Sequence, residues 1–145
     1  MSGGGRITVF AVGEVEYAVT GRIPRSLPAP APLPSVVRHG EVDFPVVDLP
    51  AAVGAGRAAG SEPLLFLVEE GAVRRALLVE RLVGAETADL EAVQPVPALY
   101  PETERRRWRG LLPRPDGRII VLLRLEGLPV AGGNSAGGNS AGAKG

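Results

Sequence analysis

Two glycine-rich stretches match sequence motifs of nucleotide-binding and catalytic proteins. Residues 54–59 (GAGRAA) fit the dinucleotide pattern, which needs a helix that begins at the glycines and points its amides at a pyrophosphate. Gly60 and Pro63 would end such a helix almost at once, so we expect a solvated loop. The pattern Gly-x-Ser-x-Gly occurs at 133–137 and 138–142, but no strand precedes these serines to form a nucleophile turn. Neither match predicts an enzyme.

The residues that most often act as acids, bases or metal ligands are few and scattered. The chain has one histidine, His39, and no cysteine, which excludes a disulfide, a zinc–thiolate site and a cysteine nucleophile. Glu41 and Asp43 would share one face of a regular strand and Asp48 the other, so they do not form a catalytic carboxylate pair. Asp48 is typical of a turn or helix cap. We therefore predict no catalytic residue, no metal site and no cofactor.

One cluster of cationic residues, RRRWR at 105–109, has the composition of a phosphate- or RNA-binding segment. Glu102 and Glu104 lie beside it, and the other arginines are dispersed. The whole chain carries 16 basic and 16 acidic side chains. Zero net charge argues against a partner held mainly through phosphates. We expect no nucleic-acid partner, and a nucleic-acid-binding barrel that uses this cluster with Trp108 stays an alternative.

Short apolar stretches separated by turn residues predict an all-β protein. Four pairs of stretches are expected to form hairpins: 7–12 with 15–19, 36–38 with 42–49, 64–69 with 73–79, and 107–112 with 118–123. Pro45 suggests a bulge or an edge position in the second hairpin. Five prolines within 22–35 predict an ordered loop or a polyproline II segment there. Short helical turns are expected at 49–53, 87–93 and 101–107.

The length of 145 residues fits one domain, or two small subdomains that share a core. Hydrophobic residues make up 45% of the chain and aromatic ones only 4%, so aliphatic side chains must fill that core. We expect a flexible N-terminus at 1–5, a folded domain at 6–130 and a disordered Gly/Asn/Ser/Ala tail at 131–145. The apolar run at 119–123 is too short to span a membrane. We therefore expect a cytoplasmic protein without membrane insertion.

The most specific sequence pattern follows Leu33-Pro34 and reads SVVRHGEVDFPVVDL over 35–49. It is accompanied by ITVFAVGEVEYAV at 7–19, ALLVERLVG at 76–84 and DGRIIVLL at 116–123. In this order, from about residue 7 to 128, the patterns resemble the CheW-like coupling proteins of bacterial chemosensory arrays. The segment 35–49 is similar to the central signature of that family, in which an Asn-x-Arg-Gly turn precedes Pro-Val-Val-Asp-Leu.

The resemblance implies a fold of two small SH3-like five-stranded β-barrel subdomains packed on a shared aliphatic core, with short helical turns. It also implies a role without catalysis, which is to bridge the cytoplasmic tips of methyl-accepting chemoreceptors to the regulatory domain of a CheA-type histidine kinase. On this basis we expect a partner-binding surface supported from within the barrel by Val46 and Asp48. Its members would be Val36, Val37, Arg38, His39 and Glu41.

The chain departs from the family pattern at several positions. His39 occupies the usual arginine position of the turn, and Ser35 stands where a glycine is usual. Glu80 and Arg124 each replace an aspartate. An alternative is therefore a divergent coupler that binds only the receptor or only the kinase and acts as a specialised adaptor or competitor, for example in the control of motility.

Overall fold

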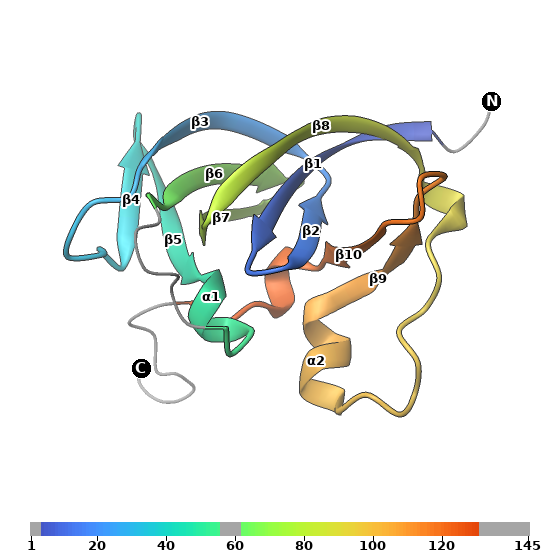
Figure 1. Ribbon diagram of the computed structural model, residues 1–145. Helices are drawn as coiled ribbons and strands as arrows, with labels where there is room; N and C mark the ends of the chain where they lie inside the picture. Colours follow the sequence, from blue (N-terminus) through green and yellow to red (C-terminus); the bar gives the residue numbers. More distant parts are fainter. Residues whose placement is uncertain (1–3, 56–61, 131–145) are drawn as a thin grey trace.

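The structure, a computed structural model, describes residues 4–55 and 62–130 (Figure 1). The expected tail with its two Gly-x-Ser-x-Gly matches lies outside these residues, as do residues 56–59 of the dinucleotide pattern. The strands are β1 (Gly4–Val12), β2 (Val15–Val19), β3 (Arg22–Pro28), β4 (Val36–His39), β5 (Val42–Asp48), β6 (Leu64–Glu70), β7 (Val73–Val79), β8 (Arg81–Asp89), β9 (Trp108–Pro113) and β10 (Ile119–Leu123). The helices are α1 (Leu49–Ala52) and α2 (Glu102–Arg107), with 3-10 turns η1 (Leu90–Ala92) and η2 (Leu125–Gly127).

The strands form two five-stranded sheets, in the orders β8-β1-β2-β10-β9 (barrel 1) and β3-β6-β7-β5-β4 (barrel 2). Barrel 2 is continuous in sequence and is inserted between β2 and β8 of barrel 1. If the strands of barrel 1 are counted in the order β8, β9, β10, β1, β2, they correspond one by one to β3, β4, β5, β6 and β7 of barrel 2, and both sheets have the same spatial order. Each sheet also contains one parallel pair at the corresponding place, β2 with β10 and β7 with β5. The two barrels are therefore circular permutants of one topology, and the predicted fold of two SH3-like subdomains is confirmed.

The central strands contain runs of consecutive apolar residues where both of their faces are buried. In β6, Leu65 and Leu67 point into barrel 2, whereas Phe66 and Val68 point toward barrel 1. In β10, the Ile120 side chain lies inside barrel 1 and its neighbour Val121 lies between the barrels. Strands buried on both sides read as continuous apolar runs rather than as alternating patterns.

A shared core holds the barrels together. The rings of Phe10 in barrel 1 and Phe66 in barrel 2 lie 6.2 Å apart, and both side chains are buried. Around them the core is mostly aliphatic, as the composition predicts, with members from both barrels and from η2: Val12, Tyr17, Val19, Val47, Leu49, Val68, Leu77, Val79, Val121, Leu123, Leu125 and Leu128.

All four predicted hairpins are confirmed as antiparallel pairs. The expectation of a loop or polyproline II segment at the start of 22–35 is wrong, because 22–28 forms β3. Its prolines are tolerated for two reasons: β3 lies at the sheet edge and pairs with β6, and its register shifts between Arg22 and Arg25, around Pro24. Pro45 of β5 pairs with Val36 of β4, and the pairing of β5 with β7 begins only at Val46. A missing N–H at residue 45 therefore removes no ladder bond.

The ends of barrel 1 also differ from expectation. Gly4 and Gly5, expected in the flexible N-terminus, belong to β1 and pair with Asp89 and Ala88 of β8. The turn expected from residue 87 is a strand up to Asp89, and only Leu90–Ala92 is a 3-10 turn. The sequence of β8 has no clear apolar alternation, so its strand conformation comes from pairing with β1.

Ion pairs and a hydrogen bond connect β8, one outer strand of the barrel 1 sheet, to the turn that follows β9, the other outer strand. The Arg114 guanidinium contacts the Glu86 carboxylate at 3.2 Å and donates to the Thr87 carbonyl at 3.1 Å. Arg118 contacts Glu86 at 3.0 Å and Glu16 at 2.8 Å, which ties β8 to β2. None of the helices within 4–55 and 62–130 is long and apolar enough to cross a membrane.

The shared core predicts that Phe66→Ala destabilises the whole protein. Loss of a buried phenylalanine costs about 3–5 kcal/mol, a large part of the about 5–15 kcal/mol typical of a folded domain. The matched control is Ile119→Ala, because the Ile119 side chain is 62% exposed and its loss should cost less than about 0.5 kcal/mol. Urea unfolding of both variants measures the difference. Equal free energies of unfolding would contradict the role given to Phe66.

Candidate partner-binding surfaces

The β4–β5 hairpin carries the predicted partner-binding residues at one end of the molecule (Figure 1). β4 is the last strand in the order of its sheet and pairs with β5. Val36 and Arg38 face outward and are exposed, whereas Val37 packs on the interior cluster of barrel 2. Glu41, in the turn, is exposed as well. We call Val36, Val37, Arg38, His39 and Glu41 the hairpin surface, and its outward-facing members are Val36, Arg38 and Glu41.

His39 is the last residue of β4 rather than a residue at the tip of the turn. Its half-buried ring stands edge-on to the buried ring of Phe44, with the ring centres 6.4 Å apart. The Arg38 guanidinium lies 3.8 Å from the Asp43 carboxylate across the hairpin, and both side chains are largely exposed. At this distance and exposure the ion pair contributes little to stability, so Arg38 is available to a partner.

The two residues expected to support this surface lie in different surroundings. The Val46 side chain is fully buried inside barrel 2, where it packs with Phe44. Asp48 is not inside the barrel: it caps α1, where its carboxylate accepts a hydrogen bond from the Ala51 amide at 3.2 Å. The cap predicted from the sequence is therefore confirmed, and β5 continues directly into α1.

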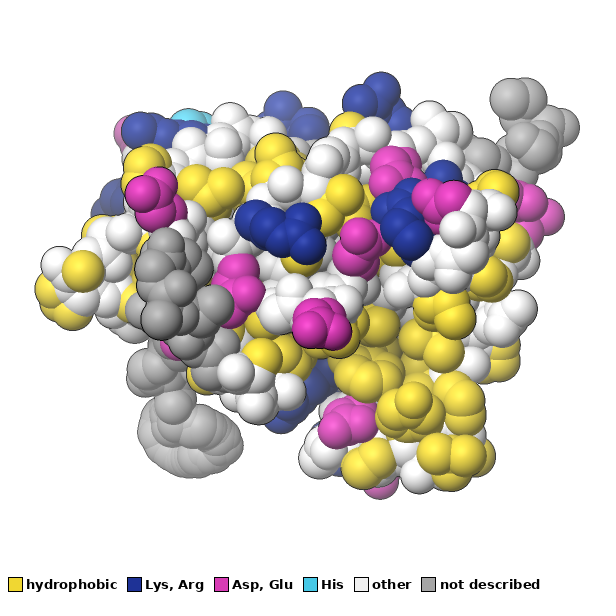
Figure 2. All heavy atoms as spheres, viewed as in Figure 1, with side chains coloured by type: hydrophobic (Ala, Val, Ile, Leu, Met, Phe, Trp, Pro, Cys, Tyr) yellow, Lys and Arg dark blue, Asp and Glu magenta, His cyan; other side chains and the backbone are white. Residues whose placement is uncertain are grey.

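A second exposed surface, which the sequence interpretation missed, lies at the other end of the molecule. Segment 95–101 (PVPALYP) joins η1 to α2, and its Leu99 side chain is 85% exposed. Figure 2 shows hydrophobic side chains gathered at the lower right, where this segment lies. We call residues 95–101 the apolar patch. The sequence signal was three prolines around one leucine, which predict an irregular segment between regular elements but do not predict its exposure.

Contacts with β9 hold the apolar patch in place. Gln94 and Leu111 exchange two backbone hydrogen bonds of 2.8 Å, and a Cβ atom at Gly110 would lie 2.6 Å from the Gln94 carbonyl oxygen. Only glycine permits this approach. At the other end of the segment, the Tyr100 ring packs edge-on against Trp108 at 5.5 Å.

The arginine cluster at 105–109 is engaged within the protein. Arg105 donates to the Tyr100 carbonyl at 3.0 Å, and Arg106 lies 3.9 Å from Glu102 in α2. Arg107 donates to the Ala52 carbonyl at 2.8 Å, and Arg109 contacts the Glu70 carboxylate at 3.3 Å. The four guanidiniums point to different partners and do not form one cationic face for a nucleic acid.

Smaller exposed apolar sites occur elsewhere. Leu82 and Val83 are exposed at the start of β8, and Val15 at the start of β2. In the described part of the chain, no group of three or more His, Cys, Asp or Glu side chains has the geometry to hold a metal ion.

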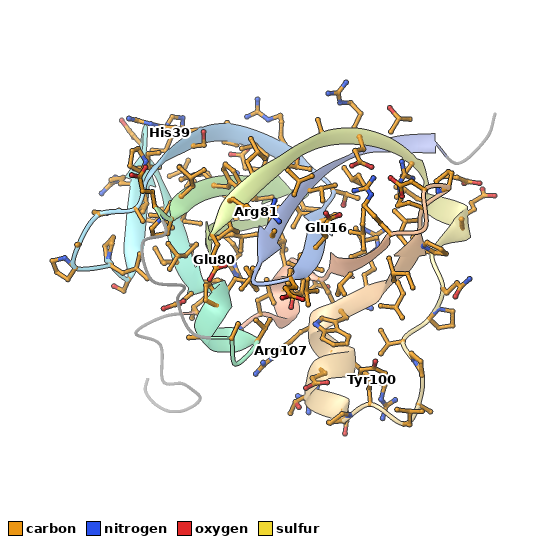
Figure 3. All side chains as sticks on the ribbon, viewed as in Figure 1. Glu16, His39, Glu80, Arg81, Tyr100 and Arg107 are labelled. Atoms are coloured by element: carbon orange, nitrogen blue, oxygen red, sulfur yellow. The ribbon has the colours of Figure 1, made fainter. Side chains whose placement is uncertain are left out.

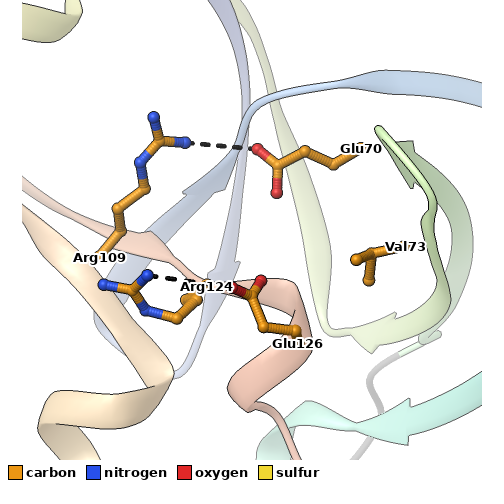
Figure 4. Close-up of a pocket in the computed structure, with 5 residues that line it drawn as sticks. All are labelled: Glu70, Val73, Arg109, Arg124 and Glu126. Carbon is orange, nitrogen blue, oxygen red and sulfur yellow. Dashed lines mark hydrogen bonds and ion pairs between the residues drawn. The ribbon is translucent and has the colours of Figure 1, made fainter.

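A charged pocket of about 520 Å³ lies between the barrels and is lined by Glu70, Val73, Arg109, Arg124 and Glu126 (Figure 4). Glu70 also accepts a hydrogen bond from the Thr20 hydroxyl. Burial raises the pKa of the Glu70 carboxyl, and nearby Glu126 adds to this effect, although Arg109 and Arg124 oppose it. The charged side chains of the pocket therefore pair with one another: Arg109 of barrel 1 with Glu70 of barrel 2, and Arg124 with Glu126.

The two SH3-like barrels with a shared core define the fold class of the chain, an all-β protein of two permuted subdomains. A family model described as "CheW-like domain" matches residues 7–130, and the chain belongs to this family. Among solved structures, the chain is similar to the crystal structure of the scaffolding protein TtCheW from Thermoanaerobacter tengcongensis. The TM-score is 0.66 and the sequence identity is 18%, with 86% of each chain covered. A search of the curated proteins found no match.

Two adjacent glutamates predict different pH dependences of stability. The Arg22 side chain donates to Glu69 at 2.9 Å and holds the pKa of that carboxyl below its ordinary value of 4.5. Ionised Glu69 therefore stabilises the fold above pH 4.5, and this contribution is lost as the pH falls. The pKa of Glu70 is raised instead. Ionisation of Glu70 therefore lowers the stability of the fold as the pH rises from 4.5 through the raised pKa of this carboxyl.

We expect Glu69→Gln to lower the melting temperature at pH 7 and Glu70→Gln to lower it less or to raise it. Both differences from the unsubstituted protein should disappear at a pH well below 4.5, where the carboxyls are protonated. Thermal unfolding followed by circular dichroism at a series of pH values measures this. A larger loss for Glu70→Gln at pH 7 would contradict the assignment.

Proposed function

We propose that this CheW-like protein is a non-catalytic adaptor of a bacterial chemosensory system. It couples the cytoplasmic tip of a methyl-accepting chemoreceptor to the regulatory domain of a CheA-type histidine kinase. It acts in the cytoplasm, at chemoreceptor arrays. Family membership supports the chemosensory role, and two separate exposed surfaces support the adaptor role.

The observation that carries this proposal is the placement of the two surfaces. The hairpin surface lies on barrel 2 and the apolar patch on barrel 1, with His39 and Tyr100 far apart across the molecule (Figure 3). A protein that must hold two partners at once needs surfaces whose occupants do not collide. The two surfaces also lie beside equivalent hairpins of the two barrels: the hairpin surface is on β4–β5, and the apolar patch adjoins β9 of the β9–β10 hairpin.

The chemistry of both surfaces fits protein partners. The hairpin surface follows a proline-rich segment and the apolar patch is itself proline-rich, and each exposes one prominent aliphatic side chain, Val36 or Leu99. Burial of such side chains drives protein association without a net charge on the chain. A standard interface involves about 20–30 residues on each partner, more than the hairpin surface or residues 95–101 contain, so neighbouring residues must contribute.

A specific observation favours the second candidate, a divergent coupler that binds only one partner. At the position where the family turn usually has an arginine, His39 is half-buried and packs against Phe44. The arginine of this hairpin surface is Arg38, one position earlier, so the cation presented to a partner stands at a different place from that in the family pattern. Such a protein would serve as a specialised adaptor or as a competitor for array sites.

Separate titrations of the purified protein with the kinase regulatory domain and with the receptor tip test the proposal, for example by isothermal calorimetry. An adaptor binds both, at dissociation constants of about 1 μM or about −8 kcal/mol. Binding of a single partner would support the divergent coupler. Binding of neither would overturn both candidates.

Two aspartate substitutions are expected to affect different partners. Val36→Asp and Leu99→Asp should each weaken binding of the partner on the altered surface by at least about tenfold, or about 1.4 kcal/mol, because a charge replaces a buried apolar contact.

Each substitution has a matched control. Val15→Asp suits the first because Val15 and Val36 both begin a strand and are 43% and 44% exposed. Thr103→Asp suits the second because it adds the same charge at an exposed position of α2 beside the apolar patch. Equal losses in a variant and its control would count against that surface.

A further inference from the structure

Arg107, the last residue of α2, lies at the junction of the two barrels and points its side chain toward α1 (Figure 3). Its guanidinium donates to the carbonyl of Ala52, the last residue of α1, at 2.8 Å. This hydrogen bond joins barrel 1 to barrel 2. Arg107 also lines two pockets of about 430 and 310 Å³, which share Ala51 and Ala52 of α1 in their lining.

On the barrel 2 side, Arg107 contacts an element that is continuous with the hairpin surface. α1 begins directly after β5, and the Asp48 cap fixes its first turn to the end of that strand. β5 in turn pairs with β4 from Val36 to His39. The carbonyls at the end of a helix lack partners within the helix, so a guanidinium donor there is favourable and fixes the orientation of α1.

On the barrel 1 side, Arg107 belongs to the segment that carries the apolar patch. Its neighbour Trp108 packs on Tyr100 at 5.5 Å, and Arg105 donates to the Tyr100 carbonyl at 3.0 Å. The Arg107 carbonyl itself accepts a hydrogen bond of 2.8 Å from the Arg124 amide. Tyr100, Trp108 and Arg107 are therefore joined by direct contacts, from the apolar patch to the last residue of α2.

We propose that Arg107 is a positioning residue that couples the two docking surfaces, so that a partner on the apolar patch changes the affinity of the hairpin surface for the other partner. This inference rests on the proposed function of an adaptor with two surfaces. The connection runs from Tyr100 through Trp108 and Arg107 to Ala52 and then along α1 into β5. By linkage, each partner changes the affinity of the other by the same factor.

Arg106 provides a matched control for Arg107. It is the preceding residue of α2 and has the same charge, but its ion pair is with Glu102 of the same helix at 3.9 Å, and both side chains are exposed. Arg106→Gln therefore removes an arginine from α2 and leaves the link to barrel 2 in place. Arg107→Lys is a second variant that keeps the charge of Arg107 but replaces the planar guanidinium with a single ammonium group.

The first experiment uses the protein alone and compares amide hydrogen exchange in Arg107→Gln, Arg106→Gln and the unsubstituted chain. The coupling predicts that Arg107→Gln speeds exchange both in β5 and α1 and in residues 93–101, whereas Arg106→Gln changes neither region. Thermal unfolding confirms that each variant is folded. Faster exchange confined to the residues next to position 107, or the same change in both variants, would overturn the inference.

The second experiment measures the affinity of each partner with and without a saturating amount of the other. The unsubstituted protein should show a change of about fivefold or more, within the range of typical coupling energies. Arg107→Gln should bring this factor close to one while the affinity for each partner alone stays unchanged, and Arg107→Lys should lower it partly.

The outcomes separate this inference from the proposed function. If both partners bind independently of each other, or if Arg107→Gln keeps the full factor, the coupling is wrong and the adaptor function stands. If neither partner binds the unsubstituted protein, the proposed function fails, and the exchange experiment alone still decides whether Arg107 links the two regions.

Discussion

The shared core between the barrels is the constraint on which the rest of the structure depends. Each central strand places alternate side chains inside its own barrel and toward the other barrel, so neither barrel can bury its apolar residues alone. The contact of Phe10 with Phe66 lies at the centre of this arrangement. Because close-packed cores resist rearrangement, the barrels hold a fixed orientation, and this orientation separates the hairpin surface from the apolar patch.

Charged residues at the edge of the core have a different role. Arg107 and Arg109 contact barrel 2 at Ala52 and Glu70, and Glu80 accepts a hydrogen bond from the Gly13 amide where the chain returns to barrel 1. These contacts are partly exposed and individually weak. They add to an orientation of the barrels that the shared core sets. Two arginines of the cluster that suggests nucleic-acid binding in the sequence, Arg107 and Arg109, make such contacts, whereas Arg105 and Arg106 contact their own segment.

Much of the fold could be predicted from the sequence, because hairpins depend on local patterns such as Asp116-Gly117 and the runs beside it. The division into two barrels was predicted from the family resemblance, which rests on the order of the motifs along the chain. β3 and β8 could not be predicted in the same way. β3 contains two prolines and β8 mixes charged, small and aliphatic residues without alternation, and their conformation comes from pairing with β6 and β1, which are distant in sequence.

The candidate site was predicted in part. The location of the hairpin surface followed from a specific pattern, but the inward direction of Val37 and His39 depends on the packing of Phe44 and could not be read from the turn. The apolar patch was missed because the exposure of Leu99 is a property of the folded surface. A leucine among prolines in a sequence is equally compatible with a buried loop.

The insertion of barrel 2 within barrel 1 has a consequence for how the chain folds. β1 and β2 are made first during synthesis, but their partners β8 and β10 follow only after all of barrel 2 has been translated. Barrel 2 closes mostly short loops, whereas barrel 1 must join segments about 70 residues or more apart, which carries a larger entropic cost. The topology thus favours an order in which barrel 2 forms first and its outer face serves as a template for barrel 1.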